Sequence, residues 1–67
     1  MKSTLKVCDM FNQKDVYSIN RAISNNQGVI ACQIIPSSKE VEIVYDDYFI
    51  TLDEIMESIE EAGYTVL

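Results

Sequence analysis

Apolar residues recur along this chain at two different spacings, and each spacing predicts a type of secondary structure. Near the N-terminus, Leu5 and Val7 alternate with polar side chains, which is the pattern of a half-buried strand. Further on, Val16, Ile19 and Ile23 recur at intervals of three and four, which place them on one face of a helix. The first part of the chain therefore predicts a strand followed by a helix.

Residues around this helix predict where it begins and ends. Asn12 suits the N-cap, and Asp15, three positions later, stands where a capping box places its acidic partner. Gly28 closes a polar stretch and can take the left-handed backbone conformation that ends helices. Met10, in the loop before the helix, is expected to fill the core.

Two more strands follow, joined by a short turn. Residues 29–35 are apolar and β-branched, residues 36–39 contain proline and serine, and residues 40–46 alternate clearly. This order predicts a hairpin. The side chains expected to face the core are Val29, Cys32, Ile34, Val41, Ile43 and Tyr45.

The C-terminal part predicts a second helix and a last strand. Thr51 and Glu54 form a second capping box after a loop at 46–49, and Gly63 ends the helix. Residues 64–67 are expected to form a short strand. The apolar stripe of this helix comprises Leu52, Ile55, Ile59 and Ala62.

The predicted order is strand, helix, strand, strand, helix, strand. Two such halves form an α+β, ferredoxin-like βαββαβ sandwich, in which two helices cover one face of a four-stranded antiparallel sheet. We expect one domain over residues 1–67, since a chain of 67 residues is near the lower limit for independent folding.

Charge is distributed unevenly along the chain. Residues 1–39 hold all five basic side chains and two acidic ones, and residues 40–67 hold nine acidic side chains and no basic one. A net charge of −6 argues against nucleic acid as a partner. No apolar run approaches the roughly 20 residues that span a bilayer, so we expect a cytoplasmic protein without membrane insertion.

The reactive residue types exclude most catalytic chemistry. The chain has no histidine, which removes the commonest general base and a common metal ligand. Its two cysteines, Cys8 and Cys32, fall on strands separated by a third, so they are expected to lie about 10 Å apart, beyond disulfide reach. We therefore expect that the protein is not an enzyme.

Apolar and loop residues together give the chain a family resemblance over almost its whole length. It resembles the heavy-metal-associated domain, the family of small copper chaperones and of N-terminal modules of metal-pumping ATPases. The matching residues are Leu5-Lys6-Val7, Met10, Val16, Ile19, Ala22-Ile23, Gly28-Val29, Val41-Glu42-Ile43 and the ending from Ile55 to Glu61-Ala62-Gly63-Tyr64.

The family's Met-x-Cys-x-x-Cys signature is changed in this chain. The stretch beginning at Met10 has Asn12 at the first ligand position and Asp15 at the second. Soft ions such as Cu(I) prefer thiolates, and two oxygen-bearing side chains do not supply the roughly six oxygens of a hard-ion site. We expect Asn12 and Asp15 to cap the helix without a metal or other cofactor.

Two functions remain open from the sequence. In the first, the domain docks or regulates another protein, such as a metal-transporting ATPase, as a monomer or weak homodimer. In the second, it carries a soft metal ion such as Cu(I) or Zn²⁺ on Cys8, with Met10 or a thiol of another molecule. The residues expected to contact a partner are Lys14, Tyr64, Glu57, Glu60 and Glu61.

Overall fold

Three strands and two helices make up the regular structure of this chain. The computed structural model describes all residues, 1–67. In chain order the elements are β1 (Lys2–Lys6), α1 (Gln13–Ser24), β2 (Val29–Ile35), β3 (Glu40–Tyr45) and α2 (Leu52–Glu61). No helix is long and apolar enough to span a membrane.

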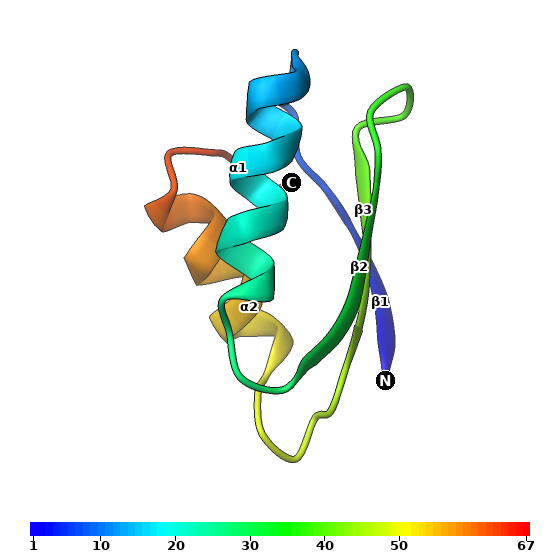
Figure 1. Cartoon of the computed structure of the whole chain (residues 1–67), viewed down its shortest axis with the longest axis vertical. Helices are drawn as coiled ribbons and strands as arrows, with labels where there is room; N and C mark the ends of the chain where they lie inside the picture. The colour runs from blue at the N-terminus through cyan, green and yellow to red at the C-terminus, as the bar shows by residue number, and fades with distance from the viewer.

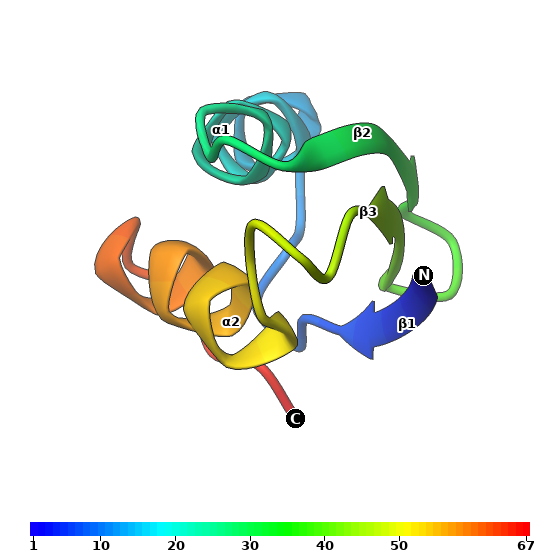
Figure 2. The same cartoon turned by 90° about the horizontal axis from the view of Figure 1, so that it is seen from below.

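The strands form an antiparallel sheet in the order β1-β3-β2. Both helices lie on one face of this sheet, side by side, and leave its other face uncovered (Figures 1 and 2). The central strand β3 pairs with both neighbours, so that Leu5 lies opposite Val41 and Cys32 lies opposite Ile43. The expected ferredoxin-like sandwich is confirmed.

The expected fourth strand is reduced to one bridge. Val66 pairs with Val7, just beyond the end of β1. Two further backbone bonds hold this segment, from Cys8 N–H to the Thr65 carbonyl and from Leu67 N–H to the Lys6 carbonyl. Residues 65–67 therefore run antiparallel beside the end of β1 over a single bridge, and the sheet has three full strands.

The core lies between the sheet and the helices. The predicted inward residues of β1 and β3 are buried, as are Ile19 and Ile23 of α1. Val16 of α1 is only partly buried against the core, and so are the three predicted residues of β2, Val29, Cys32 and Ile34. Ile50, between the loop at 46–49 and the N-cap of α2, is also buried. Ala62, predicted in the apolar stripe of the second helix, is exposed because the chain turns away at the end of α2. The core residues are Leu5, Val7, Met10, Ile19, Ile23, Val41, Ile43, Tyr45, Ile50, Ile55 and Ile59.

Both helices begin with the predicted capping boxes, at Asn12 and at Thr51. Gly63 follows α2 with a φ of +99°. There the Gly63 and Tyr64 N–H groups donate to the carbonyls of Glu60 and Ile59, which is the Schellman arrangement that ends helices.

Gly28 also has a positive φ, +103°, but it lies in the turn before β2 rather than at the end of α1. The C-cap of α1 is Asn25, which keeps a right-handed helical conformation. The helix therefore ends in the predicted polar stretch at 25–28 and Gly28 takes the predicted positive φ, but Asn25 and not Gly28 caps α1.

Candidate functional site

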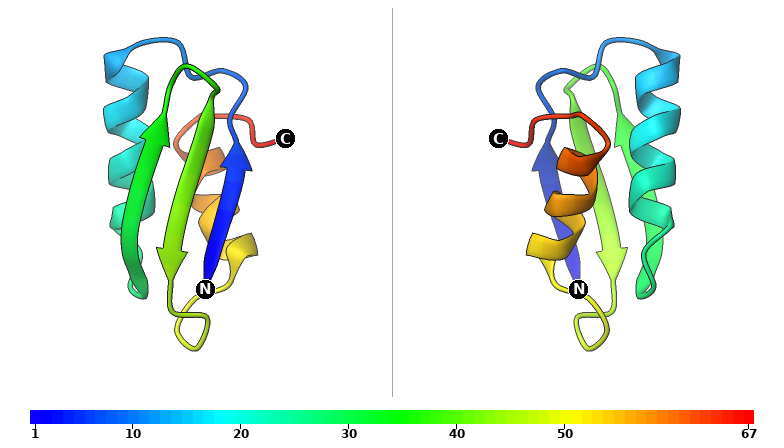
Figure 3. Two further views of the ribbon diagram at one scale, coloured as in Figure 1. Left: turned by 90° about the vertical axis from the view of Figure 1, so that its right-hand side faces the viewer. Right: turned by 90° about the vertical axis from the view of Figure 1, so that its left-hand side faces the viewer.

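The loop between β1 and α1 lies at one end of the molecule, where the C-terminal segment and the β2–β3 turn also lie (Figure 3). The C-terminal segment is tied to this loop by its backbone: Thr65 N–H donates to Asp9 Oδ1 over 2.9 Å. The Cys8 thiol faces the Thr65 carbonyl at 3.7 Å. The loop is thus enclosed by chain segments that are distant in sequence.

Asn12 and Asp15, which the sequence resemblance aligned with metal-ligand positions, are brought together as a reciprocal cap. Asp15 N–H donates to Asn12 Oδ1 over 2.9 Å. In return, Asp15 Oδ2 accepts from the N–H groups of Phe11 and Asn12, over 2.9 and 3.3 Å. Both side chains therefore satisfy free backbone N–H groups at the start of α1.

Tyr64 closes the site from the C-terminal side. Its O–H donates to Asp15 Oδ1 over 2.7 Å, across 49 positions of sequence. The Phe11 N–H and the Tyr64 hydroxyl hold the pKa of Asp15 below its ordinary value. The same hydrogen bond raises the pKa of Tyr64, because the neighbouring carboxylate disfavours loss of the phenol proton.

The donor atoms at this loop do not fit a soft metal ion. The two ligand positions present oxygens, and each carboxylate oxygen of Asp15 already accepts a hydrogen bond. Nowhere in the chain do three or more His, Cys, Asp or Glu side chains gather closely enough to hold a metal ion. Cu(I) prefers thiolates, so the family's two-thiolate chemistry has no counterpart at Asn12 and Asp15.

The cation at this loop comes from the β2–β3 turn. Lys39 Nζ donates to the Cys8 carbonyl over 3.2 Å and lies 4.2 Å from the centre of the Phe11 ring, a cation–π contact. Lys14, the loop lysine expected to meet a partner, is exposed in the first turn of α1. No sequence signal pointed to Lys39, because no spacing of residues relates the β2–β3 turn to this loop.

Of the two sulfur residues near the loop, only Cys8 has an accessible side chain. Met10 is 2% exposed and belongs to the core, as expected. Cys8 is half-buried, and both it and Cys32 are free thiols. Burial raises the pKa of the Cys32 thiol, which keeps it protonated.

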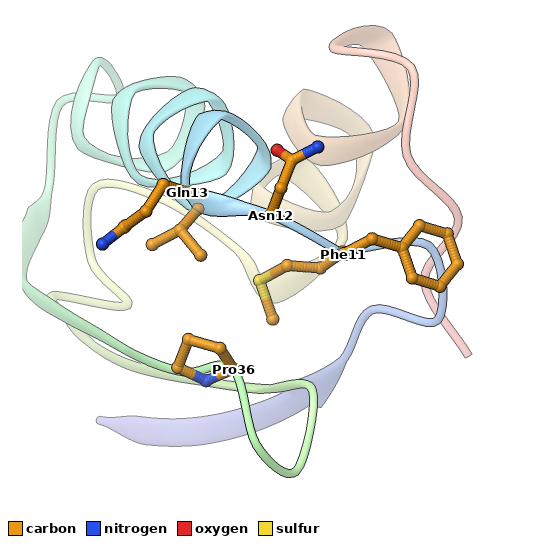
Figure 4. A pocket seen from close by; sticks show the side chains of 6 residues that line it. Phe11, Asn12, Gln13 and Pro36 are labelled. Carbon is orange, nitrogen blue, oxygen red and sulfur yellow. The ribbon is translucent and has the colours of Figure 1, made fainter.

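A hollow of about 270 Å³ opens between the loop and the turn after β2. Figure 4 shows Pro36 facing the loop across this hollow, with the Phe11 ring directed away from it. The lining is half apolar and carries no charge: Met10, Phe11, Asn12, Gln13, Val16 and Pro36.

The acidic side chains of α2 lie on the helix surface, away from the core. Glu57, Glu60 and Glu61 are exposed, and the one ion pair of the molecule joins Lys2 to Glu42 on the sheet. These glutamates therefore remain without a basic partner, and their role in binding stays a prediction.

Comparisons with known proteins place this architecture among copper-handling domains. No protein-family profile matches the sequence, and no curated protein matches it. Among solved structures, the CopZ metallochaperone superimposes with a TM-score of 0.97 at 24% identity, with all of both chains covered. This likeness establishes the fold.

Two other structures have slightly higher sequence identity. The N-terminal domain of PacS from Synechocystis PCC6803 gives a TM-score of 0.91 at 25% identity, covering 100% of this chain and 94% of that one. The yeast copper transporter domain CCC2A, solved in apo and Cu(I)-loaded states, gives 0.89 at 29% identity, covering 97% and 89%.

Proposed function

Because this chain has the fold of the heavy-metal-associated, copper-chaperone-like domains, we propose that it is a non-enzymatic docking or regulatory module with a degenerate metal site. Its loop keeps the shape of a metal-handling loop, but its side chains stabilise the protein instead of holding a metal ion. A metal-transporting ATPase in the cytoplasm is a suitable partner, since one structural neighbour is a copper-binding domain of a P-type ATPase.

The Asp15 carboxylate carries this proposal. It accepts hydrogen bonds from Phe11, Asn12 and Tyr64, so binding a metal ion there would require breaking them. Asn12 contributes a neutral amide whose oxygen is also engaged. A metal ion would gain little from two oxygens and would remove the cap of α1.

Surface features near the loop support a docking role. Phe11 is 74% exposed beside the Lys39 ammonium, and large exposed aromatic side chains are enriched at protein interfaces. Lys14 and Tyr64 lie near the same loop, and Glu57, Glu60 and Glu61 offer a complementary surface for a basic partner. Catalysis is not supported, since the chain lacks histidine and no enclosed site gathers several reactive groups.

Metal titration tests the proposal. The ¹⁵N-labelled protein is titrated with Cu(I), and separately with Zn²⁺, under reducing conditions while the amide shifts are followed. We expect no saturable micromolar binding at residues 12–15. The Asn12→Cys/Asp15→Cys double variant is the matched control, because it restores two thiolates on the same backbone and is expected to bind Cu(I).

Saturable binding by the unmodified protein, centred on Asn12 to Asp15, would overturn the degenerate-site proposal. Failure of the double variant to bind Cu(I) would show that the backbone of this loop, and not only its side chains, has lost the geometry for a metal.

A second candidate function rests on Cys8. Its thiol is free and partly accessible beside the loop, so it can join a thiol of another molecule around a soft metal ion. Met10 is too buried to complete a site within one chain. This function requires that Cys8→Ser abolish Cu(I) binding, and full affinity in that variant would exclude it.

A further inference from the structure

The two edges of the sheet are protected very differently. The β1 edge carries Lys2 and Lys6 and is crossed at its end by the Val7–Val66 bridge. Charged side chains and covering segments are the usual means of preventing an edge from pairing with other strands. The β2 edge has neither: residues 29–35 contain no charged side chain, and no strand pairs on its outer side.

In an antiparallel sheet, successive residues of a strand direct their backbone N–H and C=O groups to alternate sides. This alternation identifies which backbone groups of β2 face its open edge. Met1 and Tyr45 exchange two backbone bonds, so the odd-numbered residues of β3 point their N–H and C=O groups toward β1. Asp46 N–H donates to the Gly28 carbonyl, so the even-numbered residues of β3 point their N–H and C=O groups toward β2. The backbone groups of Val44 and Glu42 therefore bond to the β2 residues that lie opposite them.

In that register Val44 lies opposite Ala31, and Glu42 lies opposite Gln33. The alternate residues of β2, Cys32 and Ile34, must then point their N–H and C=O groups away from the sheet. Neither takes part in the loop and cap bonds of the chain. Ile30, beside the irregular register at the start of β2, is 69% exposed. The edge thus offers unpaired backbone groups next to an apolar side chain.

The hollow at the loop lies at the end of this same edge. Pro36 follows β2 directly, and Gln13 and Val16 reach the hollow from α1. Asn20 lies one helical turn further along the same side of α1. The side chains named here, which lie along the β2 edge, are therefore uncharged, although the molecule has a net charge of −6.

From these features we infer that the β2 edge binds an extended, uncharged segment of a partner protein, which adds a strand to the sheet and places an apolar side chain in the hollow. In this mode main-chain hydrogen bonds provide affinity, and pockets for alternate side chains provide specificity. The inference rests on the proposed docking function and names its surface and the class of its partner.

A second copy of this chain is a poor occupant of the edge. Helix α1 lies beside β2 at this side of the sheet (Figures 2 and 3). Pairing of β2 with its own copy about a two-fold axis would leave both α1 helices on the same face, over strands only about 4.8 Å apart. Packed helices need about 8–10 Å. A segment without a helix beside it avoids this clash.

The test uses the full-length ¹⁵N-labelled protein in reducing buffer with a chelator, so that metal has no part in the result. The probe is a short capped peptide of alternating threonine and valine. We expect saturable amide shifts at Cys32, Ile34, Gln13 and Val16 below about 1 mM peptide, with amide exchange of Cys32 and Ile34 slowed at least about tenfold.

Two matched controls define what supports the inference. A fully N-methylated peptide of the same sequence is expected to bind at least about tenfold more weakly, because it cannot donate to the edge. Ile30→Lys is expected to weaken binding by placing a charge beside the edge. Tyr48→Lys, which places the same charge at another exposed position away from the edge, is expected to leave binding unchanged.

Absence of saturable binding, indifference to N-methylation, or shifts centred on Glu57 to Glu61 would each overturn the β2-edge inference. None of these results bears on metal binding, so they leave the degenerate-site proposal standing. Conversely, Cu(I) binding at Asn12 and Asp15 would defeat that proposal while leaving the peptide result unaffected.

Discussion

At the scale of single residues, the Asp15 carboxylate connects three parts of the chain. It closes the cap of α1, it fixes the backbone of the preceding loop, and it receives the hydroxyl of Tyr64. One side chain thus uses its negative charge within the protein, near the positive end of the helix dipole.

Acid is expected to weaken this arrangement. The pKa of Asp15 is lower in the folded protein than its ordinary value of 3.8, so the folded state binds the proton less readily than the unfolded one. The resulting stabilisation is present above about pH 4 and is lost as the pH falls through the lowered pKa. Urea unfolding of wild type and Asp15→Asn should show a difference at neutral pH that disappears in acid.

Removing the Tyr64 hydroxyl tests the other half of this contact. In Tyr64→Phe the pKa of Asp15 should rise, because one of its donors is lost. The pKa can be followed by the NMR shift of the Asp15 carboxyl carbon. Tyr48→Phe is the control, since Tyr48 is 86% exposed and lies in the loop after β3. An unchanged Asp15 pKa in Tyr64→Phe would contradict the observed bond.

At the scale of elements, patterning and capping signals predicted both helices and the hairpin, because these depend on neighbours in sequence. Asn12 with Asp15 and Thr51 with Glu54 are local pairs of this kind. The lost fourth strand was not predictable in the same way, since Val66 pairs with Val7 from the other end of the chain. The contacts of Lys39 and Tyr64 with the loop are similarly long-range.

The N-cap of α1 is expected to make a measurable contribution to the free energy of unfolding. Asn12→Ala removes the acceptor for Asp15 N–H and should cost about 0.5–2 kcal/mol of unfolding free energy, whereas Asn12→Ser should retain most of it. Chemical denaturation monitored by circular dichroism gives the difference. Equal stability of Asn12→Ala and wild type would mean that the cap contributes nothing.

The two glycines should respond differently to alanine. Both have positive φ, so each substitution costs roughly 1–2 kcal/mol of backbone strain. At Gly63 a Cβ atom meets nothing within 4 Å, whereas at Gly28 it would lie 2.9 Å from the Phe49 Cβ atom and 3.0 Å from Ile50 Cγ2. Gly28→Ala should therefore be the more destabilising in thermal unfolding, and the reverse order would be inconsistent with this packing.

At the scale of the whole molecule, one buried layer lies between the sheet and the helices, and the outer side of the sheet and the outer side of the helices are open to solvent. Because β3 is the central strand, its inward side chains lie in the core between the sheet and the helices. Its outward side chains face the uncovered side of the sheet. Sequence alternation was sufficient to predict this layer. It could not identify how the site is enclosed, since the loop, the turn and the C-terminal segment meet through contacts between residues that are far apart in sequence.

Two neighbouring residues of β3, Ile43 and Val44, test whether the core lies on one side of the sheet only. Ile43 is 0% exposed at the centre of the core, so Ile43→Ala should cost about 2–5 kcal/mol, a large share of the stability of so small a domain. Val44→Ala, on the opposite face, should cost much less. Urea midpoints of the two variants make the comparison, and similar losses would argue against a one-sided core.

The N-terminus lies at the start of β1, whereas the C-terminus lies beside the other end of that strand (Figure 3). Leu67 N–H is bonded to Lys6 near the loop, whereas the Met1 ammonium is bonded to the Tyr45 carbonyl at the far end. A fluorescent reporter or affinity tag fused after Leu67 would therefore crowd the Asp15 loop, and one placed before Met1 would leave it accessible. Immobilisation for binding measurements should accordingly be made through the N-terminus.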